Sequence, residues 1–265
     1  MARTYVITGA GSGIGLATTK MLQKSGANVI GVDLKKADVI ADLSTPQGRL
    51  DAVAAAVKAA RGRVDAVICC AGLALPIAKT VSVNYFGMTE FLNAIQPTLA
   101  KSKTARAVVI SSMASLQDND RELVENMCVH DNEAWALARA QHLVDQGGGL
   151  ENLIYGSTKR AISRWVRREC IKEQWAGAGI PLNAIGPGIV KTPMVADMIA
   201  SAEARAYLDQ VVPMPLHYYM KAQEVAPLLI WLASKENTHV TGQTIYIDGG
   251  SDAVLRGDNV WDLVK

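Results

Sequence analysis

Cysteine, net charge and long apolar runs are all scarce in this sequence. Its four cysteines are Cys69, Cys70, Cys128 and Cys170, and their spacing fits no zinc site, so we expect reduced, buried thiols. The 27 basic and 25 acidic residues are interspersed and leave a net charge of +2. Such a surface has no strong field to attract nucleic acid or a membrane. The four histidines are scattered as well, so we expect no catalytic metal.

No apolar stretch is long enough to cross a bilayer, and one of the longest, residues 225–233, contains a proline. The first apolar run, residues 5–7, reaches a glycine too soon to form the core of a signal peptide. We therefore expect a cytoplasmic protein without a membrane partner. About half of the residues are apolar, which is enough for a sizeable core.

Short β-branched runs alternate with longer helical patterns along the chain. We expect strands at residues 4–8, 28–33, 66–69, 107–111, 181–185 and 244–247. We expect helices at residues 13–25, 46–60, 81–99, 156–175 and 223–233. This rhythm favours an α/β fold in which helices cover both faces of a parallel sheet. Because there is no repeat or linker, we predict a single domain over residues 1–265.

Residues 117–152 break this rhythm, because they are rich in charge and include a helical stretch at residues 132–145 that ends in Gly147-Gly148-Gly149. We interpret them as a helical insertion before the next helix. The insertion could cover the mouth of an active site, or it could set an oligomer contact.

A glycine-rich turn, residues 8–15, follows the first strand and opens the first helix. Glycines allow the backbone to approach a phosphate closely, and a helix N-terminus offers free N–H groups to a pyrophosphate. In this strand–turn–helix context the turn predicts a dinucleotide site in a Rossmann-like, doubly wound sheet. Its expected cofactor residues are Gly9, Ser12, Gly13, Ile14 and Gly15.

Asp33 ends the second predicted strand, where a carboxylate can accept hydrogen bonds from ribose hydroxyls. It would repel a 2′-phosphate by about 4 kcal/mol at about 4 Å with an effective dielectric near 20, roughly a thousandfold preference for NAD over NADP. Lys35 and Lys36 could soften that repulsion, and Asp33 could instead only cap the strand end. Asp42 is a candidate adenine contact, with a solvated turn residue as the alternative.

Tyr155 and Lys159 are four residues apart, which places both side chains on one face of a helix. An ammonium beside a phenol favours the phenolate, so Lys159 should lower the pKa of Tyr155. Tyr155 could then exchange a proton with a carbonyl or alcohol oxygen. A surface pair is the alternative, but the neighbouring dinucleotide turn favours catalysis.

Two further residues fit this chemistry. Ser112 lies just past the strand at residues 107–111 and could hold the substrate oxygen, although Ser111 competes for that role because strand alternation sends the two side chains to opposite faces. Asn84, on the helix after the Cys70-Ala71-Gly72 turn, could anchor a water that relays protons to Lys159. It could equally be an ordinary helix residue.

These motifs together resemble the short-chain dehydrogenase/reductase family over nearly the whole chain. The glycine turn matches the cofactor loop of the family, and Asn84, Ser112, Tyr155 and Lys159 match its catalytic tetrad. Residues 241–243 and 248–250 match its last strand. The resemblance implies hydride transfer with NAD at a carbonyl carbon. It also implies further cofactor contacts, at Asp42, Leu43, Ala71, Gly72, Tyr155, Lys159, Pro187, Gly188, Ile189 and Thr192.

In its finer features the chain is similar to one group in that family, the bacterial 3α-hydroxysteroid dehydrogenases/carbonyl reductases. These features are residues 41–45, 70–73 and 81–87 and the insertion. In that group a comparable insertion is associated with dimers, so we expect a homo-oligomer and favour a dimer over a tetramer. The chain departs from the family pattern at Cys70, where the family usually has asparagine. The gap between Ser112 and Tyr155 is also much longer than usual.

Residues 192–220 are expected to form a substrate lid, because the family closes this region over the substrate. The apolar side chains of this segment could form a pliable wall of a substrate pocket. These side chains are Met194, Met198, Ile199, Met214, Leu216, Tyr218, Tyr219 and Met220. The segment has no cluster of acids or arginines that would indicate a charged substrate. We expect a hydrophobic secondary alcohol or ketone, with cyclic and steroid-like compounds among the candidates. Three alternatives remain. These side chains could be packing positions, the substrate could be a polyol, a sugar or an acyl compound, or the protein could be a non-catalytic dinucleotide sensor.

Overall fold

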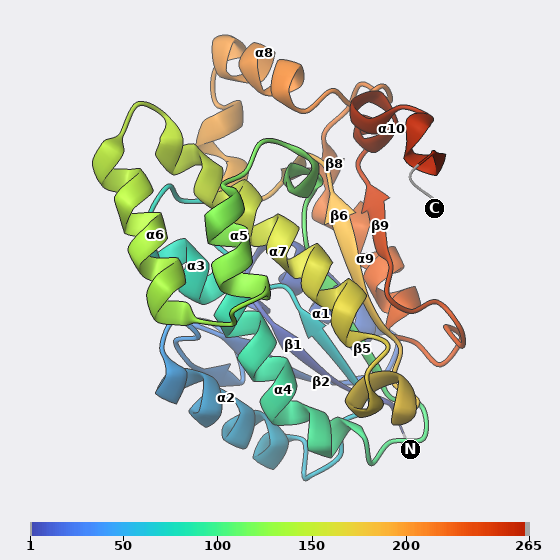
Figure 1. Cartoon of the computed structure of the whole chain (residues 1–265). Coiled ribbons are helices and arrows are strands. Elements are labelled where there is room, and N and C mark those ends of the chain that lie inside the picture. Colours follow the sequence, from blue (N-terminus) through green and yellow to red (C-terminus); the bar gives the residue numbers. More distant parts are fainter. Residues whose placement is uncertain (1, 263–265) are drawn as a thin grey trace.

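The computed structural model describes residues 2–262, and a seven-stranded sheet forms its centre (Figure 1). The strands lie in the order β3-β2-β1-β4-β5-β6-β9, and each neighbouring pair is parallel. This confirms the predicted Rossmann-like, doubly wound α/β architecture. The bounds of the seven strands are β1 Thr4–Thr8, β2 Asn28–Asp33, β3 Val39–Ile40, β4 Ala66–Cys69, β5 Arg106–Ile110, β6 Leu182–Pro187 and β9 Thr244–Ile247. A separate two-stranded ribbon pairs β7 (Val190–Lys191) with β8 (Met220–Lys221).

Helices cover both faces of the sheet, and each face has its own hydrophobic core. Strand alternation divides the apolar side chains, so Val6 faces one core while Tyr5 and Ile7 face the other. One core is shared with α2, α4, α5, α6 and α7, and the other with α1 and α9. The helix bounds are α1 Gly13–Lys24, α2 Pro46–Ala59, α3 Lys79–Val81, α4 Gly87–Leu99, α5 Arg121–Cys128, α6 Glu133–Gln146, α7 Leu153–Glu169, α8 Ala202–Val211, α9 Ala222–Leu232 and α10 Ser251–Arg256.

The strand order reverses between β1 and β4. From this point the chain adds strands outward on one side as β2 and β3, and on the other side as β5, β6 and β9. In parallel sheets, ligands bind beyond the carboxyl ends of the strands at such a switch point. The glycine turn, the Cys70 turn and Ser112 all follow strands that end there.

The insertion packs tightly onto the sheet domain. Its first helix, α5, lies against α7 and buries Leu123, Val124 and Met127. Helix α5 was not among the predicted helices, although the side chain of Asp120 caps it by accepting from the backbone N–H of Leu123 at 2.7 Å. An aspartate before a helical run is an N-cap signal that the sequence did contain.

Two predicted helices differ from the structure. The helix predicted at residues 156–175 begins earlier, at Leu153, and ends at Glu169; residues 173–177 form a separate π-turn. The helix predicted at residues 81–99 is a composite in which the π-turn Ser82–Phe86 separates α3 from α4. Such turns inside helices are frequent at functional sites, and this one carries Asn84.

Within the described part of the chain, no helix combines the length and the apolar character that a bilayer requires. Across residues 2–262, histidine, cysteine, aspartate and glutamate side chains do not gather in groups of three or more that could hold a metal ion.

Candidate active site

A cavity of about 540 Å³ opens beyond the carboxyl ends of β1, β4, β5 and β6. It brings together most of the predicted site residues, which come from seven separate stretches of the chain. The predicted residues that line it are Gly9, Ser12, Gly13, Ile14, Gly15, Asp33, Asp42, Leu43, Ala71, Gly72, Ser112, Tyr155, Lys159, Pro187, Gly188 and Thr192.

Ile189, a predicted cofactor residue, does not line this cavity. Its side chain is buried in the core on the α1 and α9 face, and its backbone N–H lies 3.4 Å from the sulfur of Met214. Its neighbours Gly188 and Val190 do line the cavity, although Val190 also packs in that core.

Several apolar residues of the cavity wall were missed. Leu34 and Leu75 are about half exposed, at 53% and 51%, and both line the cavity. Each follows a predicted cofactor residue by one to three positions, and that proximity is the signal that the sequence offered. Exposure itself cannot be read from a sequence, so an exposed leucine is indistinguishable there from a core leucine.

The glycine turn is too crowded for side chains. Gly9 has φ +71°, and a Cβ atom added to it would lie 2.6 Å from the backbone nitrogen of Ala71. A Cβ atom on Gly15 would lie 2.1 Å from the carbonyl oxygen of Gly9. Both approaches are far closer than atoms tolerate, so glycine is required at these two positions for the turn to sit against the end of β4.

The first turn of α1 borders the same cavity and suits an anion. Ser12 is its N-cap residue, and in the described structure the Ser12 side chain makes no capping hydrogen bond and the first turn carries no acid. The backbone N–H groups at this helix end therefore remain available to a ligand. A pyrophosphate would complement both these groups and the positive end of the helix dipole, so the chain fits a dinucleotide here.

Asp33 lies between the glycine turn and the cavity. Its carboxylate accepts hydrogen bonds from the backbone N–H of Gly11 at 2.9 Å and of Lys35 at 3.4 Å, and so ties the glycine turn to the end of β2. It also lines the cavity, where it could accept from a ribose hydroxyl. The side chain of Ser44 and then its backbone N–H, which donates to Asp42 at 2.8 Å, lower the pKa of the Asp42 carboxyl.

The two candidate serines are resolved by their partners. The hydroxyl of Ser111 lies 2.9 Å from the carbonyl oxygen of Lys159 and 2.8 Å from the hydroxyl of Ser163, so it braces α7. Ser112 lines the same cavity as Tyr155 and is the side chain that acts to lower the pKa of that phenol, while its hydroxyl accepts from the backbone N–H of Ala114 at 3.1 Å. The structure thus favours Ser112 as the partner of the tyrosine.

The expected effect of Lys159 on Tyr155 is wrong for the chain on its own. Burial raises the pKa of Tyr155, and the hydrogen bond from Ser112 only partly opposes this increase. The nitrogen of Lys159 lies 5.6 Å from the centre of the tyrosine ring and donates to the carbonyl oxygen of Ile110 at 3.0 Å. Burial also lowers the pKa of Lys159 itself to about 8, because desolvation disfavours the ammonium.

Asn84 lies behind the cavity wall and is 1% exposed. Its side-chain amide donates to the carbonyl oxygen of Leu73 at 2.9 Å and to the hydroxyl of Thr158 at 3.1 Å, while its oxygen accepts from the backbone N–H of Leu73 at 2.7 Å. Both amide hydrogens are therefore used to join the turn after β4 to α7. A water that relays protons at Asn84 would therefore have to bind another polar atom of this residue, such as its backbone carbonyl oxygen.

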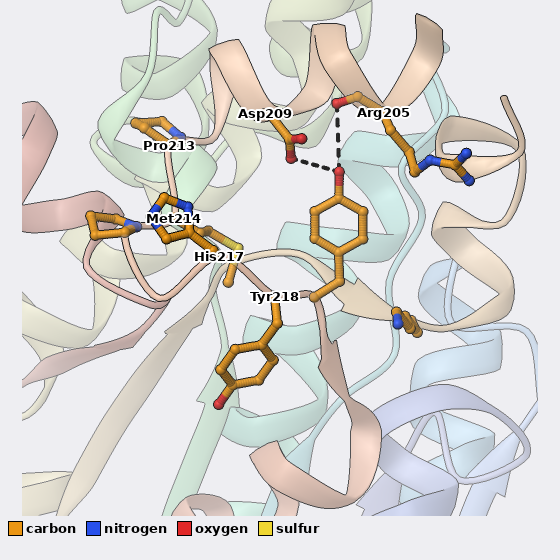
Figure 2. A pocket seen from close by; sticks show the side chains of 9 residues that line it. Arg205, Asp209, Pro213, Met214, His217 and Tyr218 are labelled. Atoms are coloured by element: carbon orange, nitrogen blue, oxygen red, sulfur yellow. Dashed lines mark hydrogen bonds between the residues drawn. The ribbon is translucent and has the colours of Figure 1, made fainter. Parts of the chain in front are cut away.

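The side chains predicted to form the apolar wall of the lid lie in two cavities and in the core. Met194 lines the catalytic cavity, whereas Met214, Tyr218 and Tyr219 line a second cavity of about 770 Å³ under α8 (Figure 2). Met220 is buried in the core, so for this residue the packing alternative is correct. The hydroxyl of Tyr219 donates to Asp209, on α8, at 2.6 Å, and a dashed line marks this contact at the labelled Asp209 in Figure 2.

Comparison with known proteins places this architecture and site in one family. Residues 3–124 match the family model described as short chain dehydrogenase, and residues 134–252 match the one described as enoyl-(acyl carrier protein) reductase. The 3-alpha-hydroxysteroid dehydrogenase/carbonyl reductase of Comamonas testosteroni is 37% identical over 95% of this chain and 97% of its own length. The chain belongs to the short-chain dehydrogenase/reductase family.

A solved structure agrees over almost the same length. The 3-alpha-hydroxysteroid dehydrogenase from Pseudomonas sp. B-0831, crystallised with NADH, has a TM-score of 0.87 and is 35% identical to this chain. The match covers 96% of this chain and 99% of that one. A more distant relative, the 3-oxoacyl-[acyl-carrier-protein] reductase of Thermotoga maritima, is 27% identical over 94% of this chain and 97% of its own length. The chain is thus an oxidoreductase of this family.

Proposed function

We propose that this protein is an NAD(H)-dependent oxidoreductase that interconverts a hydrophobic secondary alcohol, cyclic or steroid-like, and its ketone. The observation that carries the proposal is the convergence of Ser112, Tyr155 and Lys159 on the cavity that the glycine turn also lines. These residues come from the turn after β5 and from α7, more than 90 positions after the glycine turn. Their meeting at the switch point supports a single site for cofactor and proton transfer.

Each residue has a proposed task. Ser112 holds the substrate oxygen next to the phenol, and Tyr155 gives its proton to that oxygen in reduction or takes one in oxidation. When bound, the dinucleotide supplies or accepts the hydride. Lys159 reaches the nicotinamide ribose and stabilises a tyrosinate that forms during turnover. Asn84 holds the turn after β4 against α7 and supports the proton relay.

The preference for NAD rests on Asp33 and on a relative. The carboxylate at the end of β2 would meet the 2′ position of the adenine ribose and would repel a 2′-phosphate. The Pseudomonas enzyme was crystallised with NADH. Leu43 and Asp42 are proposed to contact the adenine end, and residues 187–192 the nicotinamide end.

The hydrophobic substrate is supported by the lining of the cavity near the lid. Leu73, Val83, Pro193, Met194 and Val195 all contribute to it and none carries a charge. The relative from Comamonas is named for hydroxysteroids and carbonyl compounds. A panel of ketones and polyols would test this preference; activity confined to polyols would contradict it.

Replacing Tyr155 with phenylalanine tests the catalytic proposal against the alternative of a non-catalytic dinucleotide sensor. The substitution removes only the hydroxyl, so we expect turnover to fall by at least about 10²-fold while NADH still binds. Tyr207→Phe is the matched control, since Tyr207 is 67% exposed on the outer part of the lid. Unchanged turnover in the Tyr155 variant would remove this residue from the mechanism.

We also propose a cytoplasmic homodimer. The support is the resemblance of the insertion to that of a group in which it accompanies dimers. Light scattering coupled to size exclusion would give the mass, and a tetramer would contradict the proposal.

A further inference from the structure

Arg49, on the first turn of α2, uses every N–H group of its guanidinium, and its side chain is 1% exposed. It donates to Glu133 from both terminal nitrogens, at 2.7 and 2.6 Å, and to Glu90 at 2.9 Å. The other two donors go to backbone carbonyl oxygens, those of Leu43 at 2.9 Å and Ser82 at 3.2 Å. Five satisfied donors in one buried group fix the side chain in a single position.

The two backbone carbonyls belong to one residue of the cavity wall and to one residue just outside it. Leu43 lines the catalytic cavity next to Asp42, at the end where adenine is proposed to bind. Ser82 opens the π-turn that carries Asn84 two residues later. The Arg49 guanidinium thus fixes the distance between Leu43, in the cavity wall, and the start of the π-turn that carries Asn84.

The chain around Arg49 cannot shift independently of that wall. Thr45 caps α2 by accepting from the backbone N–H of Gly48 at 3.1 Å, and a Cβ atom added to Gly48 would lie 2.1 Å from the carbonyl oxygen of Asp42. Residues 42–49 therefore form a tight unit in which the guanidinium and the Leu43 carbonyl are rigidly related.

Glu133 is the link to the insertion, because it is the first residue of α6. Its carboxylate accepts from the guanidinium in a bidentate arrangement, and its side chain is 20% exposed, against 43% for Glu90. Glu90 belongs to α4, which the sheet already supports through Phe91 and Leu92. Bidentate pairs with arginine specify both distance and orientation, so Glu133 contributes the more directional contact.

We propose that Arg49 is a positioning residue through which the insertion shapes the cofactor site, so that the Glu133–Arg49 pair sets the affinity for the dinucleotide. This inference rests on the proposed function, since it concerns the same cavity. The insertion then has a task besides covering the active site or making an oligomer contact. Through Glu133, α6 holds the Arg49 guanidinium in contact with the Leu43 and Ser82 carbonyls. Loosening the pair should weaken dinucleotide binding more than it slows the chemical step.

The test compares Glu133→Gln with Glu90→Gln. Glutamine keeps the size of the side chain, and in either variant the remaining glutamate still neutralises Arg49, so both should fold. Binding of NADH is followed by its fluorescence, binding of AMP by competition, and kcat and KM for the cofactor by steady-state kinetics. We expect Glu133→Gln to raise the NADH and AMP dissociation constants about tenfold with kcat within about twofold, and Glu90→Gln to change them less than about threefold.

A third variant separates positioning from general loosening of the insertion. Leu143→Ala removes a fully buried side chain of α6 that is remote in sequence from Glu133. If it weakens NADH binding as much as Glu133→Gln does at the same loss of melting temperature, the pair has no special role and the proposal is wrong. Unchanged NADH affinity in Glu133→Gln would overturn it equally. Wild-type protein that bound neither NADH nor AMP would instead overturn the proposed function on which this inference depends.

Discussion

Lys159 donates a hydrogen bond of 3.0 Å to the carbonyl oxygen of Ile110, the last residue of β5. The contact anchors the end of the lysine to the strand that precedes Ser112, and so places a cation between the sheet edge and α7. Because the group is buried, its pKa is lowered to about 8. A cation that titrates near neutral pH makes activity sensitive to pH in a range that is easily measured.

Ketone reduction should therefore lose efficiency in alkaline solution. We expect kcat/KM to fall as the pH rises through about 8, where Lys159 of the free enzyme loses its proton. Lys159→Met should be slower at every pH and should lack this inflection. An inflection that persists in the methionine variant would assign the titration to another group.

The same pKa predicts how stability changes with pH. The lysine titrates near 10.5 when unfolded and near 8 when folded, so between these values the unfolded chain binds more protons. The free energy of unfolding should therefore rise from pH 8 to 10, with a slope of at most about 1.4 kcal/mol per pH unit. Urea titrations of wild type and Lys159→Met over this range test it. Parallel curves would show that Lys159 is not the source of the slope.

Asp33→Asn should shift the cofactor preference. Asparagine keeps one acceptor oxygen, which can serve the backbone N–H of Gly11, but it removes the charge and the longer contact with the N–H of Lys35. We expect the ratio of kcat/KM for NAD to that for NADP to fall by roughly 10- to 1000-fold, since the lost repulsion is about 4 kcal/mol at most. Asp42→Asn is the control and should affect both cofactors alike. An unchanged ratio in the Asp33 variant would mean that other groups discriminate.

Tyr219→Phe should loosen the lid. It removes the hydroxyl that donates to Asp209 and so joins the strand β8 to α8. We expect KM for the ketone to rise about two- to tenfold and α8 to become more sensitive to limited proteolysis, as for a net loss of about 1 kcal/mol. Tyr218→Phe, the neighbour in the same cavity, should leave both readouts unchanged. Equal effects in the two variants would contradict the contact's role.

Leu123→Ala tests whether the insertion is part of one cooperative domain. Leu123 is fully buried where α5 meets α7, so its truncation should cost about 2–5 kcal/mol in the free energy of unfolding. Val129→Ala, at a site that is 52% exposed, should cost under about 1 kcal/mol. One unfolding transition is expected for each protein. A separate early transition for the insertion would show that it folds apart from the sheet.

Local patterns were sufficient for much of the fold. The strands at residues 4–8, 28–33, 66–69 and 244–247 match the predicted bounds because short β-branched runs between turns have few alternatives. The π-turn before α4 could not be predicted, since its extra residue per turn comes from tertiary packing and not from helix propensity. The helix predicted to continue to residue 175 ends at Glu169, and residues 173–177 form a separate π-turn.

By itself the sequence determined the order of the motifs, and with it the sheet, the glycine turn and the spacing of Tyr155 and Lys159. Only the tertiary structure decided which atoms meet. It separated Ser112 from Ser111, sent the Lys159 ammonium to Ile110, and buried Arg49 between two carboxylates. Periodicity reports which face of an element a side chain occupies. Burial, pKa and hydrogen-bond partners depend on what the rest of the chain packs against that face.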